Sequence, residues 1–385
     1  MISAPTTPMA NDNLLIFADS AQCADLRYAV GVAVTEPFIY LRVKGRAYAL
    51  LGDSDLVRAR QQARNCRVLS LARYQGRAAV SEGGRTALAE VIRRLAAEKQ
   101  ARRLWVPAGF PLGLARELRR LKVRVKPRRD ELFFPERELK SAAEIEMIRA
   151  ALVMAEVGMA EAVQALRNSK PGPRGRLLYR GAPLTAERLR AIIQVAVLQA
   201  GGHACEAGVA GGRQAFSPQE PGSGPLAARQ PIVIRIAPRS DKTGYHGDLT
   251  RTVVRGQASE GMRRLNAVVE QAQDTAVGLS REGVKAAAIH RAVQAQFSQA
   301  GYRTLRGPGA PRGCLHGTGH GIGLERDEPP WLTATSPAVL RSGHVLAIGP
   351  GLYYPELGGV CIKDLVVVTR NGARNLTRFE KVLEV

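Results

Sequence analysis

The sequence has 385 residues, of which 45% are hydrophobic and 23% charged. Its length suggests two domains, and its apolar fraction excludes a disordered or collagen-like chain. The formal net charge is +22, from 56 Lys and Arg against 34 Asp and Glu, and such an excess attracts polyanions. No apolar run is long enough to predict a transmembrane helix, and residues 1–12 lack the basic and apolar segments of a secretory leader.

The five cysteines are scattered and form neither a CxxC zinc pattern nor a disulfide framework. We therefore expect a reduced, soluble, cytoplasmic protein without a membrane partner. No zinc finger, RNP-type aromatic motif or basic-leucine heptad accompanies the charge. Nucleic acid is thus expected to bind only non-specifically, and the arginine excess is interpreted mainly as a compositional bias.

The first third of the chain alternates predicted strands and helices. Apolar strands are predicted at 14–21, 29–34 and 38–51, a helix follows Asp53 to Arg64, another covers 86–99, and a further strand covers 103–107. This alternation is typical of an α/β layer domain. It ends near Phe133–Pro135, so we place a domain boundary between residues 138 and 139.

A helix-rich segment begins at Ser141, where Ser141 and Glu144 form a capping box ahead of a helical apolar stripe that runs to Leu166. Further elements are predicted from periodicity and turn residues. They are a helix at 185–200, strands at 232–237 and through Asp248 to Arg255, helices near 260–279 and 284–300, and strands within 314–385, including 359–369.

Three short motifs are more specific than packing requires. They are Gly-Tyr-His-Gly-Asp-Leu-Thr-Arg-Thr at 244–252, His-Gly-Thr-Gly-His-Gly-Ile-Gly-Leu-Glu at 316–325, and Pro-Gly-Leu-Tyr at 350–353, followed by Gly-Gly-Val-Cys-Ile-Lys-Asp at 358–364. Their order and spacing resemble the Xaa-Pro aminopeptidase, prolidase and creatinase family, M24. The resemblance implies an α+β protein, with a pita-bread C-terminal domain (139–385) behind a creatinase-type α/β N-terminal domain (1–138).

The resemblance also implies a two-metal site of two aspartates, one histidine and two glutamates, a ligand set suited to Mn, Co or Zn. Two of these ligands are present, as Asp248 and His320. The other three positions carry Arg235, Gly349 and Lys363. Since two of these replacements are cations, we expect the two-metal site to be lost, with Asp248 and His320 as vestiges and no cofactor bound.

The family's substrate-handling histidines are eroded as well. Gln219 and Asp327 stand at two of these positions, whereas His316 is retained as a vestigial member of the set. Cys361 replaces an arginine of the final motif. The resemblance therefore implies that no catalytic set is intact, and a creatinase-like hydrolase without metal is disfavoured because it relies on the histidine replaced by Gln219.

Local structural roles are the alternative for these residues. We expect Arg235 and Lys363 to pair with Asp248 and Asp327, because a buried charge is costly unless it is paired. His320 is expected to form a local hydrogen bond, and the glycines beside it are expected to allow a tight loop. A hydrolase built on Cys314 and His316 is conceivable but lacks a third orienting group.

The leading interpretation is a non-catalytic member of the family, a pseudoenzyme that binds peptides or other anions in a cationic cleft. The alternative is a weak Xaa-Pro aminopeptidase or dipeptidase with one divalent Mn, Co or Zn, held by Asp248, His320 and Asp327. A protein that associates with nucleic acid through charge alone is a third interpretation. The resemblance also implies a homodimer.

Overall fold

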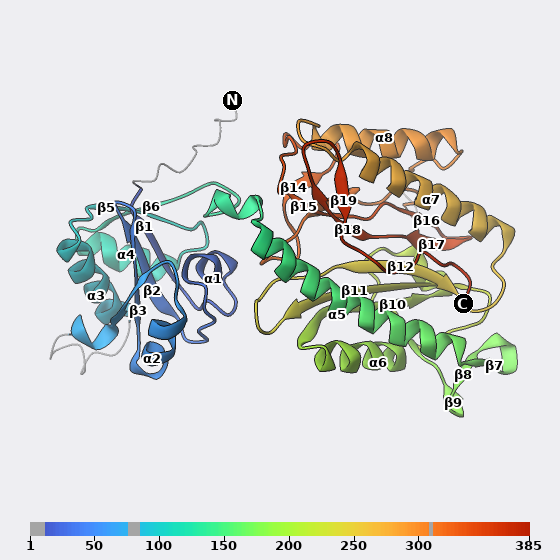
Figure 1. The fold of residues 1–385 in the computed structure, drawn as a ribbon, viewed down its shortest axis with the longest axis horizontal. Coiled ribbons are helices and arrows are strands. Elements are labelled where there is room, and N and C mark those ends of the chain that lie inside the picture. The colour runs from blue at the N-terminus through green and yellow to red at the C-terminus, as the bar shows by residue number, and fades with distance from the viewer. Residues whose placement is uncertain (1–11, 76–84, 308–310) are drawn as a thin grey trace. The chain divides into compact units, whose positions relative to one another are not determined.

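The computed structural model describes residues 12–75, 85–307 and 311–385 (Figure 1). The chain forms two compact units, Met1–Arg137 and Glu138–Val385. Within the described residues, no helix is both long and apolar enough to cross a membrane. The cytoplasmic location predicted from the sequence stays a prediction, and residues 1–11, on which the argument against a leader rested, lie outside the described part.

The N-terminal unit is built on a six-stranded sheet with the order β4-β3-β2-β1-β5-β6. β2 is antiparallel to its neighbours β1 and β3, and the other pairs are parallel. The strands are β1 (Leu14–Ala18), β2 (Phe38–Val43), β3 (Arg46–Leu51), β4 (Arg67–Ser70), β5 (Arg103–Val106) and β6 (Arg124–Pro127). The helices are α1 (Ala24–Val30), α2 (Asp53–Gln62), α3 (Arg85–Glu98) and α4 (Leu112–Arg120).

Both faces of this sheet are covered, because successive residues of a strand point to opposite faces. Leu15 packs in a core with side chains of α3 and α4. Leu14 belongs to a second core with side chains of α1 and α2. The unit is therefore the three-layer α/β structure that the alternating pattern predicts.

Two predicted strands of this unit need correction. The strand predicted at 29–34 is wrong, because α1 extends to Val30 and ends at Gly31, whose φ of 75° is left-handed, and residues 31–34 belong to no strand. The stretch 38–51 is a hairpin, because Lys44 and Gly45 have φ values of 49° and 79° and turn the chain between β2 and β3. Helix α4 was not predicted.

The C-terminal unit contains two main sheets. One has the order β10-β11-β12, and the other has the order β14-β13-β15-β18-β19. The strands of the first are β10 (Gly202–Gly211), β11 (Pro231–Ser240) and β12 (Leu249–Val254). Those of the second are β13 (Gly319–Gly321), β14 (Glu328–Leu332), β15 (Val345–Ile348), β18 (Asp364–Val368) and β19 (Ala373–Asn375). A hairpin joins β16 (Gly351–Tyr354) to β17 (Gly358–Cys361), and three short strands, β7 (Lys170–Pro171), β8 (Leu177–Tyr179) and β9 (Ala182–Pro183), form a small sheet.

Four helices cover these sheets, α5 (Ala142–Arg167), α6 (Ala186–Gln199), α7 (Glu260–Leu279) and α8 (Ala286–Gln299). α5 contacts β11 and α6 contacts β10, whereas α7 and α8 pack against each other and against strands of the second sheet (Figure 1). The predicted capping box of α5 is confirmed, since the Ser141 hydroxyl accepts from the Glu144 backbone and the Glu144 carboxylate accepts from the Ser141 N–H.

Two strand predictions in this unit are shifted. Asp248 immediately precedes β12 and does not lie within it. The stretch 359–369 is split into β17 and β18, with Ile362 and Lys363 between them. Lys363 nevertheless pairs with β12, because its backbone N–H donates to the Thr250 carbonyl at 3.0 Å. This pairing joins the two sheets close to Asp248.

Candidate functional site

The C-terminal unit holds a cavity of about 240 Å³ where the two sheets meet. It collects residues from β10, β11, β13 and the 361–363 segment, together with the loops that precede β12 and β14. Its lining includes every position that the resemblance assigned to a metal ligand or a substrate-handling histidine: Gln219, Arg235, Asp248, His316, His320, Asp327, Gly349 and Lys363. The fold therefore brings together residues that are up to 144 positions apart in the chain.

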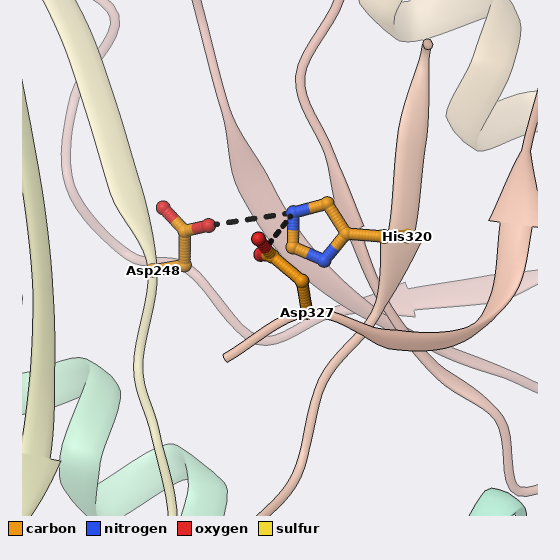
Figure 2. Close-up of side chains that lie close together, drawn as sticks. All are labelled: Asp248, His320 and Asp327. Atoms are coloured by element: carbon orange, nitrogen blue, oxygen red, sulfur yellow. Dashed lines mark ion pairs between the residues drawn. The ribbon is translucent and has the colours of Figure 1, made fainter. Parts of the chain in front are cut away.

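Three of these side chains converge on one point (Figure 2). Asp248, His320 and Asp327 each offer one ligand atom, and these atoms all lie within 4.8 Å of one another. The Nε2 atom of His320 is 3.7 Å from Oδ2 of Asp248 and 3.2 Å from Oδ1 of Asp327. Ligand atoms about 2.1 Å from a tetrahedral ion would lie about 3.4 Å apart, so the spacing suits one bound metal ion.

The protonation state of His320 bears on whether this cluster can bind a cation. Its Nδ1 is 2.9 Å from the Gly321 carbonyl, which can only accept a hydrogen bond, so Nδ1 carries the hydrogen. Burial and the nearby Lys363 cation lower the pKa of His320, although the two aspartates oppose this effect. The ring is therefore neutral at pH 7, and the lone pair of Nε2 faces two carboxylates. A cation between these atoms would remove their mutual repulsion.

Lys363 contacts the same carboxylate oxygen of Asp248 that faces His320. Its Nζ atom donates to Oδ2 of Asp248 at 2.7 Å, and the Asp248 side chain is only 5% exposed. Burial acts to lower the pKa of Lys363, but Asp248 outweighs it and the pKa is raised. The predicted pairing of Lys363 with Asp248 is confirmed, and the lysine stays charged at neutral pH.

Gly349 makes room for this lysine. A Cβ atom at Gly349 would lie 2.7 Å from Cγ and 2.8 Å from Cβ of Lys363. These distances are shorter than ordinary van der Waals contacts, so a glutamate at position 349 cannot coexist with the observed lysine conformation. The two departures from the family pattern at positions 349 and 363 are therefore structurally coupled.

The predicted pairing of Arg235 with Asp248 or Asp327 is wrong. The guanidinium of Arg235 lies 3.5 Å from the Glu206 carboxylate and donates to the Glu220 carbonyl at 2.9 Å. It lies against Gly208, its partner in the β10–β11 register, where a Cβ would be 2.7 Å from an arginine nitrogen. Because the neighbouring strand leaves this space open, the arginine points toward β10 and the 206–220 segment.

Asp327 has partners other than those predicted. It accepts from Arg326 at 2.6 Å and lies beside His320. Burial acts to raise its pKa, but His320 and Arg326 outweigh that effect and the pKa is lowered. Arg326 also pairs with Glu206. The carboxylate at this family histidine position is therefore ionised and available as a ligand, but it is not a proton donor at neutral pH.

His316 does not form a dyad with Cys314. The Cys314 thiol donates to the His316 backbone carbonyl, and burial raises the pKa of this thiol to about 11. The His316 imidazole is instead 2.9 Å from the Tyr353 hydroxyl through Nε2 and 2.8 Å from the Gly317 carbonyl through Nδ1. A thiolate nucleophile at Cys314 is thus disfavoured.

The local hydrogen bond predicted for His320 is confirmed, but the glycines beside it have a different role from the one predicted. Gly319 and Gly321 lie in β13, between β14 and β15, where a Cβ would meet the Ala347 and Pro329 carbonyl oxygens at 2.2 Å. They allow close backbone approach within a sheet. They do not form a tight loop.

Sequence reasoning missed Arg251, the largest of the fully buried side chains. It donates to Oδ1 of Asp364 at 2.7 Å and to the Lys363 carbonyl at 3.0 Å, and so holds the segment that carries Lys363. The signal was available, because an arginine within the apolar strand Leu249–Val254 needs a buried partner just as Arg235 does. The segment Thr250–Thr252 therefore positions Lys363 in addition to packing in the strand.

The residues present do not fit a two-metal centre. Gly349 has no side-chain donor, and the lysine at 363 places a cation on Asp248. They do fit one ion, through two carboxylates and an imidazole. The expectation that no cofactor binds is therefore not supported, and the geometry favours the alternative of one divalent ion.

Comparison with known families places this site in context. The model of metallopeptidase family M24 matches residues 146–370. The Xaa-Pro dipeptidase of Pyrococcus furiosus is 37% identical over 139 residues, a segment that covers 36% of this chain and 38% of that protein. The alignment thus spans less than half of this curated relative.

Solved structures share the fold over nearly the whole chain. The prolidase from Pyrococcus horikoshii has a TM-score of 0.78 at 23% identity and covers 97% of this chain and 96% of its own. The Xaa-Pro dipeptidase from Bacillus anthracis has a TM-score of 0.81 at 20% identity, with coverages of 97% and 95%. The expected fold, an α/β unit followed in the chain by a pita-bread unit, is confirmed.

Proposed function

Because this chain belongs to metallopeptidase family M24, we propose that it is a peptidase that uses a single divalent metal ion and hydrolyses short Xaa-Pro peptides. The observation that carries this proposal is the position of His320, whose Nε2 lies 3.2 Å and 3.7 Å from two carboxylate oxygens while its Nδ1 lies 2.9 Å from the Gly321 carbonyl. Mn, Co or Zn would suit these donors. The names of the dipeptidase relatives support the substrate class.

An ion held there would supply Lewis-acid activation of a peptide carbonyl or of water. The chain itself supplies the walls of the cavity, where Trp331 and Tyr353 offer aromatic surface beside the triad. The small cavity favours a short peptide over a folded protein substrate. His316 and Tyr353 form a hydrogen-bonded pair in the cavity lining that could orient a bound peptide.

Slow turnover is part of the proposal. Lys363 takes the place of a second ion beside Asp248 and supplies positive charge, but it cannot bind water as a Lewis acid. Gln219 and the ionised Asp327 lack the imidazole that proton transfer to a leaving amine would use. Both features lower the expected rate without preventing peptide binding.

A second candidate is the non-catalytic peptide-binding protein, which the 2.7 Å ion pair between Lys363 and Asp248 favours. The lysine competes directly with a metal for this carboxylate. The cavity does not favour anions by net charge, because its three cations are matched by three carboxylates: Arg235, Arg326 and Lys363 against Glu206, Asp248 and Asp327. Anion binding and a homodimer stay predictions.

Metal analysis coupled to a peptidase assay separates these candidates. The purified full chain, dialysed against Mn, Co or Zn, is expected to retain close to one ion per chain and to cleave an Xaa-Pro dipeptide slowly. His320→Ala and Asp327→Asn should lose both the ion and the cleavage. Asp241→Asn is the matched control, since Asp241 is an exposed carboxylate paired with His203 outside the cavity.

A different result would favour the second candidate. If no ion is retained and cleavage is absent with excess metal, while an Xaa-Pro peptide still binds in calorimetry, the chain is a binding protein. Binding that is lost in variants of the cavity would then locate the peptide there.

A further inference from the structure

A second hollow, in the N-terminal unit, has a charge pattern unlike that of the candidate site. Its volume is about 940 Å³, and among the described residues its lining contains six cations and no carboxylate. The cations are Lys44, Arg93, Arg102, Arg103, Lys122 and Arg124. We refer to these six residues as the basic edge. All of them except Arg93 are exposed.

The topology of the sheet explains why these residues meet. β5 and β6 are parallel neighbours, and their first residues, Arg103 and Arg124, are register partners. Parallel strands begin at the same edge of a sheet. β2 runs in the opposite direction, so its last residues and the following Lys44 reach that same edge. Segments far apart in the sequence thus present cations to one hollow.

Ordinary helix-end stabilisation accounts for only part of this charge. Helices α3 and α4 end here, and each C-terminus is equivalent to about −0.5 elementary charge. Arg93 is satisfied by Glu90, to which it donates at 2.6 Å and 2.7 Å. Roughly four positive charges therefore remain. Among the described residues, the other five cations form no ion pair, although Arg103 lies over the Trp105 ring.

The distribution of charge along the chain supports the contrast between the unbalanced N-terminal hollow and the balanced C-terminal cavity. Residues 1–140 carry 26 basic and 14 acidic side chains, a net charge of +12, in the smaller part of the protein. In the C-terminal cavity, three cations face three carboxylates. A compositional bias alone would not match charges in one hollow and leave them unmatched in the other.

We propose that the basic edge binds the phosphate backbone of a nucleic acid strand. Arginine is well suited to phosphate, because its planar guanidinium offers paired donors. The cations surround a hollow, which suits an extended polyanionic chain better than the flat surface of a lipid bilayer. No aromatic side chain lines the hollow in the described residues, so the contacts position phosphates and do not read bases.

Fluorescence anisotropy of the full chain with a labelled, mixed-sequence single-stranded RNA tests this inference. The test variant is the triple Arg103→Gln, Lys122→Gln and Arg124→Gln. The control triple, Arg370→Gln, Arg374→Gln and Arg378→Gln, removes the same charge from exposed positions in the other unit. Equal thermal midpoints of the three proteins show that each variant is folded.

The expected result is a loss of affinity of about tenfold or more in the test triple, and a change of less than about twofold in the control. The slope of log K against log salt should fall by about 2, since each phosphate contact contributes about 0.7 for single strands. Equal weakening of both triples, or no RNA binding at low salt, would overturn the proposal. Binding to phosphatidylserine vesicles but not to RNA would overturn it as well.

Lysine footprinting supplies a test that needs no variant. Bound RNA should slow the acetylation of Lys44 and Lys122 severalfold, as read by mass spectrometry. The exposed Lys285 of the C-terminal unit should react at an unchanged rate. Equal protection of all three lysines would show that the charge of the whole chain, and not this edge, attracts the RNA.

Discussion

The side chain of Lys363 fills the space that a β-carbon at Gly349 would need. An added Cβ would lie 2.7–2.9 Å from three carbons of the lysine, while the lysine Nζ reaches Asp248 at 2.7 Å. Positions 349 and 363 are both metal-ligand positions in the family that the sequence resembles. In this chain they form one unit, in which the absence of a side chain at 349 permits a cation at 363.

Gly349→Ala should therefore destabilise the protein through Lys363. The new methyl group overlaps the lysine chain, and overpacking of this kind costs about 1–3 kcal/mol. Urea denaturation of Gly349→Ala, Lys363→Ala and the double variant forms a cycle, and the alanine at 349 should cost much less when the lysine is shortened. Gly109→Ala is the control, because a Cβ there meets nothing within 4 Å. Equal costs in both backgrounds would contradict the coupling.

Lys363→Met should leave Asp248 buried without its cation. Loss of one partner of a buried pair costs about 3 kcal/mol or more. A divalent ion should then replace the lysine charge, so Mn or Co should raise the thermal midpoint of Lys363→Met more than that of the wild type. Calorimetric scans with and without metal measure the difference. A variant that is destabilised but indifferent to metal would argue against an ion at the triad.

Arg251→Met should destabilise the protein more than a surface arginine substitution. Arg251 and Asp364 are each 2% exposed and paired at 2.7 Å, so the change leaves a buried carboxylate unpaired, at a cost of about 3–5 kcal/mol. The exposed Arg370 provides the matched control, Arg370→Met. Urea midpoints decide the point, and similar values for the two variants would show that Arg251 is not an anchor.

Acid should destabilise the fold through His316. Burial lowers the pKa of His316 to about 4, below the usual value of 6.5, so the unfolded state takes up a proton first as the pH falls. The contribution of His316 to the free energy of unfolding is complete above pH 6.5 and is lost progressively as the pH falls toward 4. Allowing for partial exposure of the ring, it amounts to about 1–2 kcal/mol. The wild-type urea midpoint should fall over this range more steeply than that of His316→Gln, and parallel curves would exclude His316 as the cause.

Much of the fold follows from local patterns. The capping box at Ser141 and the apolar stripe behind it predicted α5, because both depend on residues within one or two helical turns. The predicted strand at 29–34 was wrong because a short apolar run does not distinguish a helix end from a strand. Helix α4 was not predicted from the sequence. It is short, follows Pro111 and ends in Arg119 and Arg120.

The candidate site was predicted in part. Asp248, His320 and Asp327 were identified as one set of ligand positions, and the structure brings their ligand atoms within 4.8 Å. The partner of Arg235 was wrong because it depends on Gly208, a residue of the neighbouring strand that leaves space for the guanidinium. The contribution of Arg251 depends on segments more than 100 residues away.

The sequence by itself determined the family resemblance, the two-unit architecture it implies, and the replacement of three ligand positions by Arg235, Gly349 and Lys363, since residue identities and their spacing are local information. Only the tertiary structure decided where the charges go. It placed Lys363 on Asp248, turned Arg235 toward Glu206, left Nε2 of His320 facing two carboxylates, and gathered six cations at one edge of the N-terminal sheet. The physical reason is that charge pairing and steric room depend on distances across strands and loops, which spacing along the chain does not specify.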